Sequence, residues 1–413
     1  MNNWTSIYLA VFLAGAASTL ILTPFFRRLA VLSGFMDLPA ANHKGHRKAT
    51  PLLGGAALFT GWIGCLALGV TALRFGWIPG GAELLDRHLE GFAAVSGRLF
   101  CIVLGAALAV LLGLWDDRRP MGAAAKFAGQ FAVALIAVAL IAVLLGGVRI
   151  KLFGGSPWLN SGITLFWFML LMNSINFFDN MDGLAVGTVS IAMGCFTAIA
   201  ALNEQYFIAV LSALSCGVGC GFWFYNANPA SIFMGDSGSH FLGYLAAVIS
   251  SGVTFFDRSY SLSRFPMLMP LFILALPLFD TVMVVAIRTR NRKPFWIGDH
   301  NHISHRFVRM GLDRKQAVML VHLMALSIGL GILPVFWGDF RTAAILVAQS
   351  LLLLTIITML QFSLSKTPDA RETVEETMPP PEAEAGKRKL RTGGAPADAE
   401  EEIPAPESAP PRK

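Results

Sequence analysis

Apolar segments long enough to cross a membrane limit most strongly what this chain can fold into. Of its 413 residues, 55% are hydrophobic and 14% are charged. Runs of about 18 or more apolar residues are typical of membrane-spanning helices, because about 20 residues cross the hydrocarbon core. About eleven such segments occur, at 4–26, 52–73, 99–115, 124–148, 163–178, 184–201, 207–225, 239–255, 266–287, 317–337 and 342–362. The sequence therefore predicts an all-α polytopic membrane protein with about eleven transmembrane helices.

Lys and Arg residues concentrate in alternate loops and predict an orientation. They gather after the first segment (for example Arg27 and Lys48), after the third (Arg118) and after the ninth (Arg288). The positive-inside rule places such loops in the cytoplasm. We therefore expect the N-terminus outside and the C-terminus inside.

Residues 363–413 differ in composition from the rest of the chain. They are rich in Pro, Ala and Glu and nearly free of aromatic residues, so they cannot bury enough apolar surface to fold. We predict a transmembrane domain over 1–362 and a disordered cytoplasmic tail over 363–413. The net charge of +6 suits anionic lipid or an anionic substrate. We expect no nucleic-acid partner, because no soluble basic domain is present.

Asparagine and aspartate recur at every third position near the end of the fifth segment, at Asn173, Asn176, Asp179 and Asp182. On a helix such residues form a polar stripe, which must face the bundle or a water-filled cleft. Asn180 and Gly183 both tolerate left-handed backbone and would let the chain leave the helix. Interhelical hydrogen bonding alone would explain the asparagines. The added carboxylates favour a cation site.

Further acids lie at other segment ends on the predicted cytoplasmic side. Asp116 and Asp117 end the third segment, and Asp236 precedes the eighth in "FMGDSGSHFLG". Carboxylate and amide oxygens suit a hard cation, Mg²⁺ or Mn²⁺, which commonly takes its other ligands from substrate phosphates and water. Asp236 could instead serve as an ordinary helix N-cap. Together the acids predict an active site at the cytoplasmic face.

The loop "GDHNHISHRFVRMG" supplies positive charge. Four of its residues have the spacing of one helical face: His302, His305, Arg306 and Arg309. Such a face could clamp phosphate, and Asp299 could cap the helix. A solvated basic face, lipid head-group binding and a zinc site on the two histidines are alternatives. Lys48 and Lys126 are the candidate phosphate contacts in the other basic loops.

In combination, the motifs resemble those of the polyprenyl-phosphate N-acetylhexosamine-1-phosphate transferases, the MraY/WecA-type family. The resemblance covers 1–362 and rests on five stretches: "DLPAANHKGHRKATPLLGG", "GLWDDRR", "NSINFFDNMDGLA", "FMGDSGSHFLG" and "PLFDT" with "DHNHISHRFVRMGL". It implies transfer of a sugar 1-phosphate from a UDP-N-acetylhexosamine to undecaprenyl phosphate, with release of UMP. It also implies a location in the inner (cytoplasmic) membrane of a bacterium and allows for a homodimer.

The resemblance implies roles for individual residues. Asp116 and Asp117 match the paired aspartates, one of which would deprotonate or position the lipid phosphate. Asn176 and Asp236 match Mg²⁺ ligands. The remaining matches concern substrate and the histidine motif: Asp179 beside the acids, Asp182 and Phe233 at the uridine, and His302 with His305 on the loop.

Three positions depart from the family pattern. Pro120 replaces a third aspartate, Asn180 replaces a glycine, and Ser304 stands where relatives often have histidine. The histidine run favours the GlcNAc branch over the MurNAc-pentapeptide branch, and so does the prediction of eleven spans, and not ten, with a cytoplasmic tail. The expected pathway is cell-envelope polymer synthesis, such as cell wall or lipopolysaccharide O-antigen. A cation-coupled transporter is the alternative from another class, although the acids cluster at one face and no internal repeat is evident.

Overall fold

A computed structural model describes residues 3–37, 49–75, 77, 81–145, 156–253, 255, 262, 264–294, 296 and 301–364. Lys48 and Asp299, which the sequence placed near the site, lie outside these residues. So does the predicted tail from residue 365 onward, and the assignment of that tail stays a prediction.

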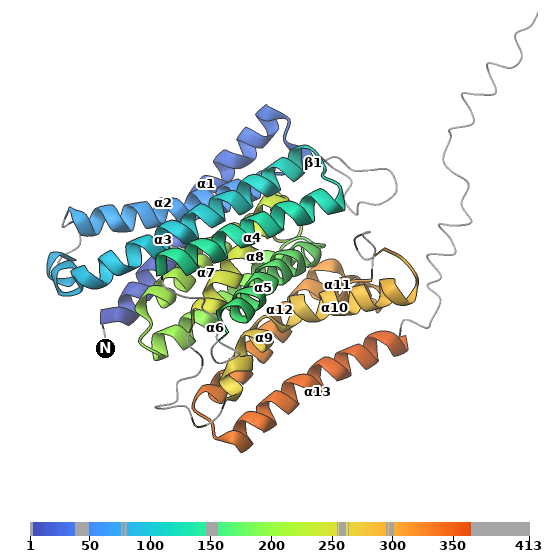
Figure 1. The fold of residues 1–413 in the computed structure, drawn as a ribbon. Coiled ribbons are helices and arrows are strands. Elements are labelled where there is room, and N and C mark those ends of the chain that lie inside the picture. Colours follow the sequence, from blue (N-terminus) through green and yellow to red (C-terminus); the bar gives the residue numbers. More distant parts are fainter. Residues whose placement is uncertain are drawn as a thin grey trace, which may run out of the picture. The chain divides into compact units, whose positions relative to one another are not determined.

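The described chain is almost entirely helical (Figure 1). The only strands in the described part, β1 (Met36–Asp37) and β2 (Thr50–Pro51), pair antiparallel. The helices are α1 (Asn3–Ser33), α2 (Gly54–Arg74), α3 (Gly81–Arg118), α4 (Ala123–Leu145), α5 (Pro157–Phe178), α6 (Leu184–Leu202), α7 (Tyr206–Asn226), α8 (Gly235–Gly252), η1 (Phe265–Leu268), α9 (Met269–Ile273), α10 (Ala275–Arg290), α11 (Ile303–Arg309), α12 (Arg314–Ile332), η2 (Leu333–Phe336) and α13 (Phe340–Leu364).

Nine helices of the described chain are long and apolar enough to cross a membrane, and a bent pair makes a tenth. The pair is η1–α9 with α10, which meet at a bend of 73°. Pro277 explains the break, because it has no N–H to donate to the carbonyl four residues earlier. The prediction of an all-α polytopic membrane protein is confirmed.

The predicted span 239–255 corresponds to α8, which is helical but too polar to count as a span by composition. All its residues from Ser237 to Ser250 are buried, and its main neighbours are α2, α3, α5, α6 and α7. A helix enclosed by other helices does not face lipid, so its sequence need not be uniformly apolar. The sequence predicted about eleven spans. Within the described residues, ten helices qualify by length and composition when the bent pair counts as one, and the difference is this enclosed helix.

Glycines bring two neighbours close to the start of α8. A Cβ on Gly113 of α3 would lie 2.3 Å from the backbone nitrogen of Ser237. A Cβ on Gly55 of α2 would lie 2.2 Å from the nitrogen of Gly238. Only hydrogen fits in these gaps, so both glycines are needed for the backbones to approach this closely.

The polar segment ends meet at one end of the bundle, which lies to the right in Figure 1, where β1 and α11 are labelled. Alternating helix directions bring the ends of α3, α5 and α7 together with the starts of α4, α6 and α8. Asp313 and Gln316 form a capping box that starts α12 after the α11 segment. The candidate functional residues lie on these helix ends and the short connections between them.

Candidate active site

Asp117 holds the start of α8. Its Oδ1 accepts a hydrogen bond from the backbone N–H of Asp236 at 2.7 Å, and its Oδ2 accepts one from Ser237 at 3.0 Å. A carboxylate at this position satisfies helix donors that have no partner within the helix and complements the helix dipole. The capping role that the sequence allowed for Asp236 therefore belongs to Asp117, and the side chain of Asp236 is available for other contacts.

Lys126 joins two of the predicted acids. Its Nζ lies 2.9 Å from Oδ2 of Asp116 and 2.8 Å from Oδ2 of Asp236. Asp116 also accepts a hydrogen bond from the backbone N–H of Met121 at 2.6 Å. The Asp236 side chain is 29% exposed and that of Asp116 only 6%. Asp236 is therefore the carboxylate of this pair that a ligand can reach.

Asn176 contacts Asp236 from the side of α5. Its Nδ2 donates to Oδ1 of Asp236 at 2.5 Å and to Oγ of Ser239 at 2.9 Å. Ser239 in turn donates to the backbone carbonyl of Asp236 at 3.2 Å. The structure thus brings together Asp116, Asp117, Lys126, Asn176 and Asp236, which come from four helices.

A second polar layer lies one helical turn deeper. Gln130, Asn173 and His240 are connected: Asn173 Nδ2 donates to Gln130 Oε1 at 2.8 Å, and Gln130 Nε2 lies 2.8 Å from His240 Nε2. Asn173 Nδ2 also donates to the carbonyl of Met169, which can only accept, so the orientation of both amides is fixed. His240 Nε2 must then be the acceptor, which places the proton of the neutral ring on Nδ1.

The sequence prediction did not include Gln130 and His240 in the site. Each follows a site residue by four positions on the same helix, Lys126 on α4 and Asp236 on α8. Side chains at this spacing share a helix face. That spacing was available in the sequence and would have identified both residues.

The predicted polar stripe on the fifth segment is only partly correct. Helix α5 ends at Phe178, so Asn173 and Asn176 lie on it but Asp179 and Asp182 do not. Burial raises the pKa of Asp179 to about 8, and the negative charges of Asp236, Asp117 and Asp182 add to this effect. Asp179 therefore lies within electrostatic reach of the acid cluster as a carboxyl that keeps its proton at neutral pH.

Asp182 forms hydrogen bonds with the connection between α7 and α8. Its Oδ2 accepts hydrogen bonds from Asn228 Nδ2 at 2.9 Å and from the backbone N–H of Ala230 at 3.0 Å. Phe233 lies in the same connection, where its N–H donates to the carbonyl of Pro51 and its carbonyl accepts from Gly54. The backbone position of Phe233 is thus fixed, while its side chain is half-buried.

Of the two residues after α5 that tolerate left-handed backbone, one adopts it and the other does not. Gly183 has φ +75°, and its N–H donates to Asn226 Oδ1 at 3.1 Å. Asn180 is not among the described non-glycine residues with positive φ. A glycine is therefore not required at position 180, and the asparagine contributes through its side chain.

Asp280 fixes the first histidine of the α11 segment. Its Oδ2 lies 2.6 Å from Nδ1 of His302, and its Oδ1 accepts the N–H of Ile303 at 2.6 Å. Both side chains are buried. Because Nδ1 carries the proton in this hydrogen bond, Nε2 of His302 remains the other functional nitrogen. The sequence placed Asp280 within a motif but gave it no role.

The predicted basic face is shorter than a full helical face. His302 is the N-cap of α11 and not part of the helix, and its ring centroid lies 6.3 Å from that of His305. Arg306 is buried and donates from Nε to the carbonyl of Asn301 at 3.0 Å. The segment therefore presents two histidines and a buried guanidinium on a fixed turn.

The donor set fits a hard cation better than zinc. In the part of the chain that the structure describes, no group of three His, Cys, Asp or Glu side chains is arranged to hold a metal ion. Asp236 has carboxylate oxygens and Asn176 an amide oxygen, and Mg²⁺ typically uses one or two carboxylates and completes its shell from water and phosphates. These two residues therefore fit Mg²⁺, whereas the zinc alternative finds no third ligand among the described residues.

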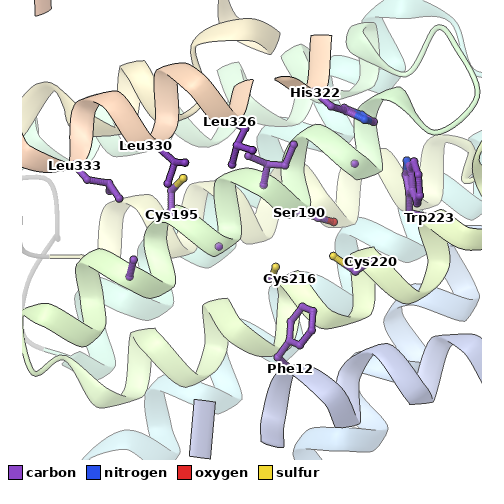
Figure 2. A pocket seen from close by; sticks show the side chains of 14 residues that line it. Phe12, Ser190, Cys195, Cys216, Cys220, Trp223, His322, Leu326, Leu330 and Leu333 are labelled. Atoms are coloured by element: carbon purple, nitrogen blue, oxygen red, sulfur yellow. The ribbon is translucent and has the colours of Figure 1, made fainter. Parts of the chain in front are cut away.

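A separate cavity of about 430 Å³ lies between α1, α6, α7 and α12 (Figure 2). His322 and Trp223 lie at one end of it, and Cys195, Cys216 and Cys220 lie along it. None of the predicted site residues lines this cavity. Its lining has no carboxylate or guanidinium, so it does not suit a nucleotide diphosphate.

Comparison with known proteins agrees with the site geometry. Residues 99–253, which include Asp116, Asn176 and Asp236, match the family described as Glycosyl transferase family 4. A probable undecaprenyl-phosphate N-acetylglucosaminyl 1-phosphate transferase of Bacillus subtilis is 30% identical over 322 residues, which are 76% of this chain and 80% of that protein. A decaprenyl-phosphate N-acetylglucosaminephosphotransferase of Mycolicibacterium smegmatis is 27% identical over 382 residues, 87% of this chain and 89% of that protein.

Similarity extends to another branch over a shorter stretch. A phospho-N-acetylmuramoyl-pentapeptide-transferase of Bacillus cytotoxicus is 30% identical over 257 residues, 58% of this chain and 72% of that protein. The match to the Bacillus subtilis protein is long enough to establish kinship over most of both chains. The chain belongs to glycosyl transferase family 4.

Proposed function

We propose that this protein transfers GlcNAc 1-phosphate from UDP-GlcNAc to undecaprenyl phosphate, giving undecaprenyl-diphosphate-GlcNAc and UMP. One observation carries the proposal: Asp236 lies between Asn176 and Lys126 at the mouth of a membrane bundle. A site at this position can hold the phosphate of a membrane lipid beside a nucleotide that arrives from solution. The names of the relatives support a polyprenyl phosphate as acceptor and N-acetylglucosamine phosphate as the transferred group.

In this reaction an oxygen of the lipid phosphate attacks the β-phosphorus of UDP-GlcNAc. A new P–O bond forms, the bond from the β-phosphorus to the bridging oxygen breaks, and UMP leaves with that oxygen. Two anions must approach each other, so catalysis consists mainly of positioning and charge neutralisation. Lys126, His302, His305 and Arg306 are the cationic or hydrogen-bonding groups for these phosphates.

Asp117 acts in this proposal as a positioning residue. The sequence left open whether one of the paired aspartates deprotonates or positions the lipid phosphate. Both oxygens of Asp117 already accept backbone amides, which supports the positioning role. Asp116 is held by Lys126 and Met121 and sets the position of the Lys126 ammonium.

Asp236 and Asn176 would hold Mg²⁺, or Mn²⁺ in its place, which when bound supplies positive charge at the diphosphate. Asp179, Asp182 and Phe233 are the proposed contacts for the donor nucleotide, and Lys48 stays a prediction. The positive loops support a site facing the cytoplasm of a bacterial inner membrane, with the N-terminus outside. The homodimer and the envelope-polymer pathway also stay predictions.

The alternatives differ in measurable ways. A MurNAc-pentapeptide transferase would prefer UDP-MurNAc-pentapeptide as donor. A cation-coupled transporter would place its ionisable groups near the bilayer midplane between repeats, whereas these acids lie at helix ends.

Purified protein should be assayed for UMP release with undecaprenyl phosphate and, in turn, UDP-GlcNAc, UDP-GalNAc and UDP-MurNAc-pentapeptide. We expect turnover with UDP-GlcNAc that stops with EDTA and returns with Mg²⁺. Asp236→Asn is the matched inactive control. Absence of UMP release under all three donors, or release that does not need the lipid phosphate, would refute the proposal.

A further inference from the structure

A side-chain contact links the acid cluster to the histidine segment. The hydroxyl of Ser304, on α11, donates a hydrogen bond to Oδ1 of Asn180 at 2.5 Å. Ser304 is fully buried, so its hydroxyl is committed to this contact and is not available to a substrate. Asn180 lies two residues after the end of α5.

The orientation of the Asn180 amide is fixed independently. Its Nδ2 donates to the backbone carbonyl of Phe177 at 3.1 Å, and a carbonyl can only accept. Oδ1 therefore faces Ser304, as the hydrogen bond requires. Asn180 thus donates a hydrogen bond to one of the last carbonyls of α5 and accepts one from Ser304 of α11.

The contact closes a ring of three helices. Asp280 of α10 holds the other side of the α11 start through His302 and Ile303. Arg288, also on α10, lies over the ring of Phe177 on α5 at 5.7 Å. The chain of contacts therefore runs from α5 to α11, from α11 to α10, and back to α5. Two anchors, one on α10 and one just after α5, fix a segment of seven residues.

The side chains of Asn180 and Ser304 depend on each other through one hydrogen bond. The backbone at position 180 does not need a glycine, because Asn180 does not have positive φ. Removing the Asn180 side chain would leave the buried Ser304 hydroxyl without this bond, which costs free energy.

We propose that Asn180 and Ser304 form a matched positioning pair that sets the placement of His302 and His305 relative to the acid cluster, and with it the affinity for the donor's diphosphate. This inference rests on the proposed function for the identity of the donor. The contact itself makes the pair act as a unit, so that changes at the two positions are not independent.

The test compares Ser304→Ala, Asn180→Gly and the double variant Asn180→Gly/Ser304→Ala in the full-length protein. We expect each single change to raise KM for UDP-GlcNAc by about tenfold, the equivalent of one lost buried hydrogen bond, with a smaller effect on kcat. The double variant should be no worse than the more affected single variant. Ser212→Ala, which alters a fully buried serine on α7, is the matched control.

Hydrogen exchange supplies a readout that does not depend on turnover. Ser304→Ala should speed exchange of the amides in 303–309 without affecting 237–250, and Ser212→Ala should not change 303–309. Three results would each refute the proposed pairing. They are effects on KM that multiply in the double variant, an unchanged KM in both single variants, and unchanged exchange in 303–309. The wild-type reaction separately tests the proposed function, because an inactive wild type refutes that function while the exchange experiment still judges the contact.

Discussion

Oδ1 of Asp117 lies 2.7 Å from the backbone nitrogen of Asp236, so one predicted site aspartate caps the helix that carries another. In Asp117→Asn the amide offers one acceptor oxygen in place of two, and the negative charge at the helix start is lost. We expect a loss of about 1–3 kcal/mol in the free energy of unfolding and a fall of about 100-fold or more in turnover. Thermal unfolding in detergent and UMP release measure the two effects.

Asp236→Asn is the matched comparison, because the half-buried Asp236 side chain faces the site and does not cap a helix. It should reduce turnover as severely while changing the melting temperature little. Equal stability of the Asp117→Asn variant and the wild type would show that the cap does not matter for the fold.

Gly113→Ala tests the close approach of α3 to α8. The added Cβ would lie 2.3 Å from the backbone of Ser237, so the helices must separate and Asp117 must move away from the α8 amides. We expect a large drop in melting temperature and loss of turnover. Gly97→Ala, on the same helix with nothing within 4 Å of the new Cβ, should be neutral or slightly stabilising, because alanine favours a helix by about 1 kcal/mol. Equal behaviour of the two variants would contradict the packing described here.

Asp179 predicts a pH-dependent stability. Its pKa rises from an ordinary value of 3.8 to about 8 in the fold, so the folded state binds more protons than the unfolded state between these values. The stabilising contribution is therefore fully present below pH 3.8 and is lost as pH rises through 8. Asp179→Asn should melt like the wild type near pH 4 and at a higher temperature above pH 8. A difference in melting temperature that does not vary with pH would refute the raised pKa.

The deeper polar layer predicts non-additive substitutions. Gln130→Leu leaves Nε2 of His240 without its partner, while Asn173 Nδ2 keeps its hydrogen bond to the carbonyl of Met169. A buried polar group left without a partner costs about 1–3 kcal/mol. Adding His240→Leu removes that group, so the double variant should be more stable than the sum of the two single effects predicts. Chemical denaturation of all three variants gives the coupling. Strict additivity would show that the layer does not act as a unit.

Hydrophobic segment length predicted the fold class and the positions of the helices, because a lipid environment allows few alternatives to long helices. It did not predict that α8 is enclosed, since enclosure depends on neighbours that are distant in the sequence. The motifs indicated Asp117, Asn176 and Asp236 as a group, and the structure brings these residues together. Their chemical roles stay predictions.

Other features could not be read from residue types. The sequence treated Asn180 as a backbone residue, but its amide contacts Ser304, which is 124 positions away. The role of Asp280 likewise depends on the contact between α10 and the start of α11, which the sequence does not reveal. Hydrogen bonds between distant segments depend on helix rotation and bending, and a 73° bend is not visible in a hydropathy pattern.

The enclosure of α8 has a consequence for biosynthesis. Asp236 and His240 lie in its first two turns, and charged or strongly polar residues oppose the insertion of a helix into a bilayer. Its main neighbours, α2, α3, α5, α6 and α7, all precede it in the chain, so they leave the ribosome first. The helices that surround α8 are thus synthesised before α8 itself.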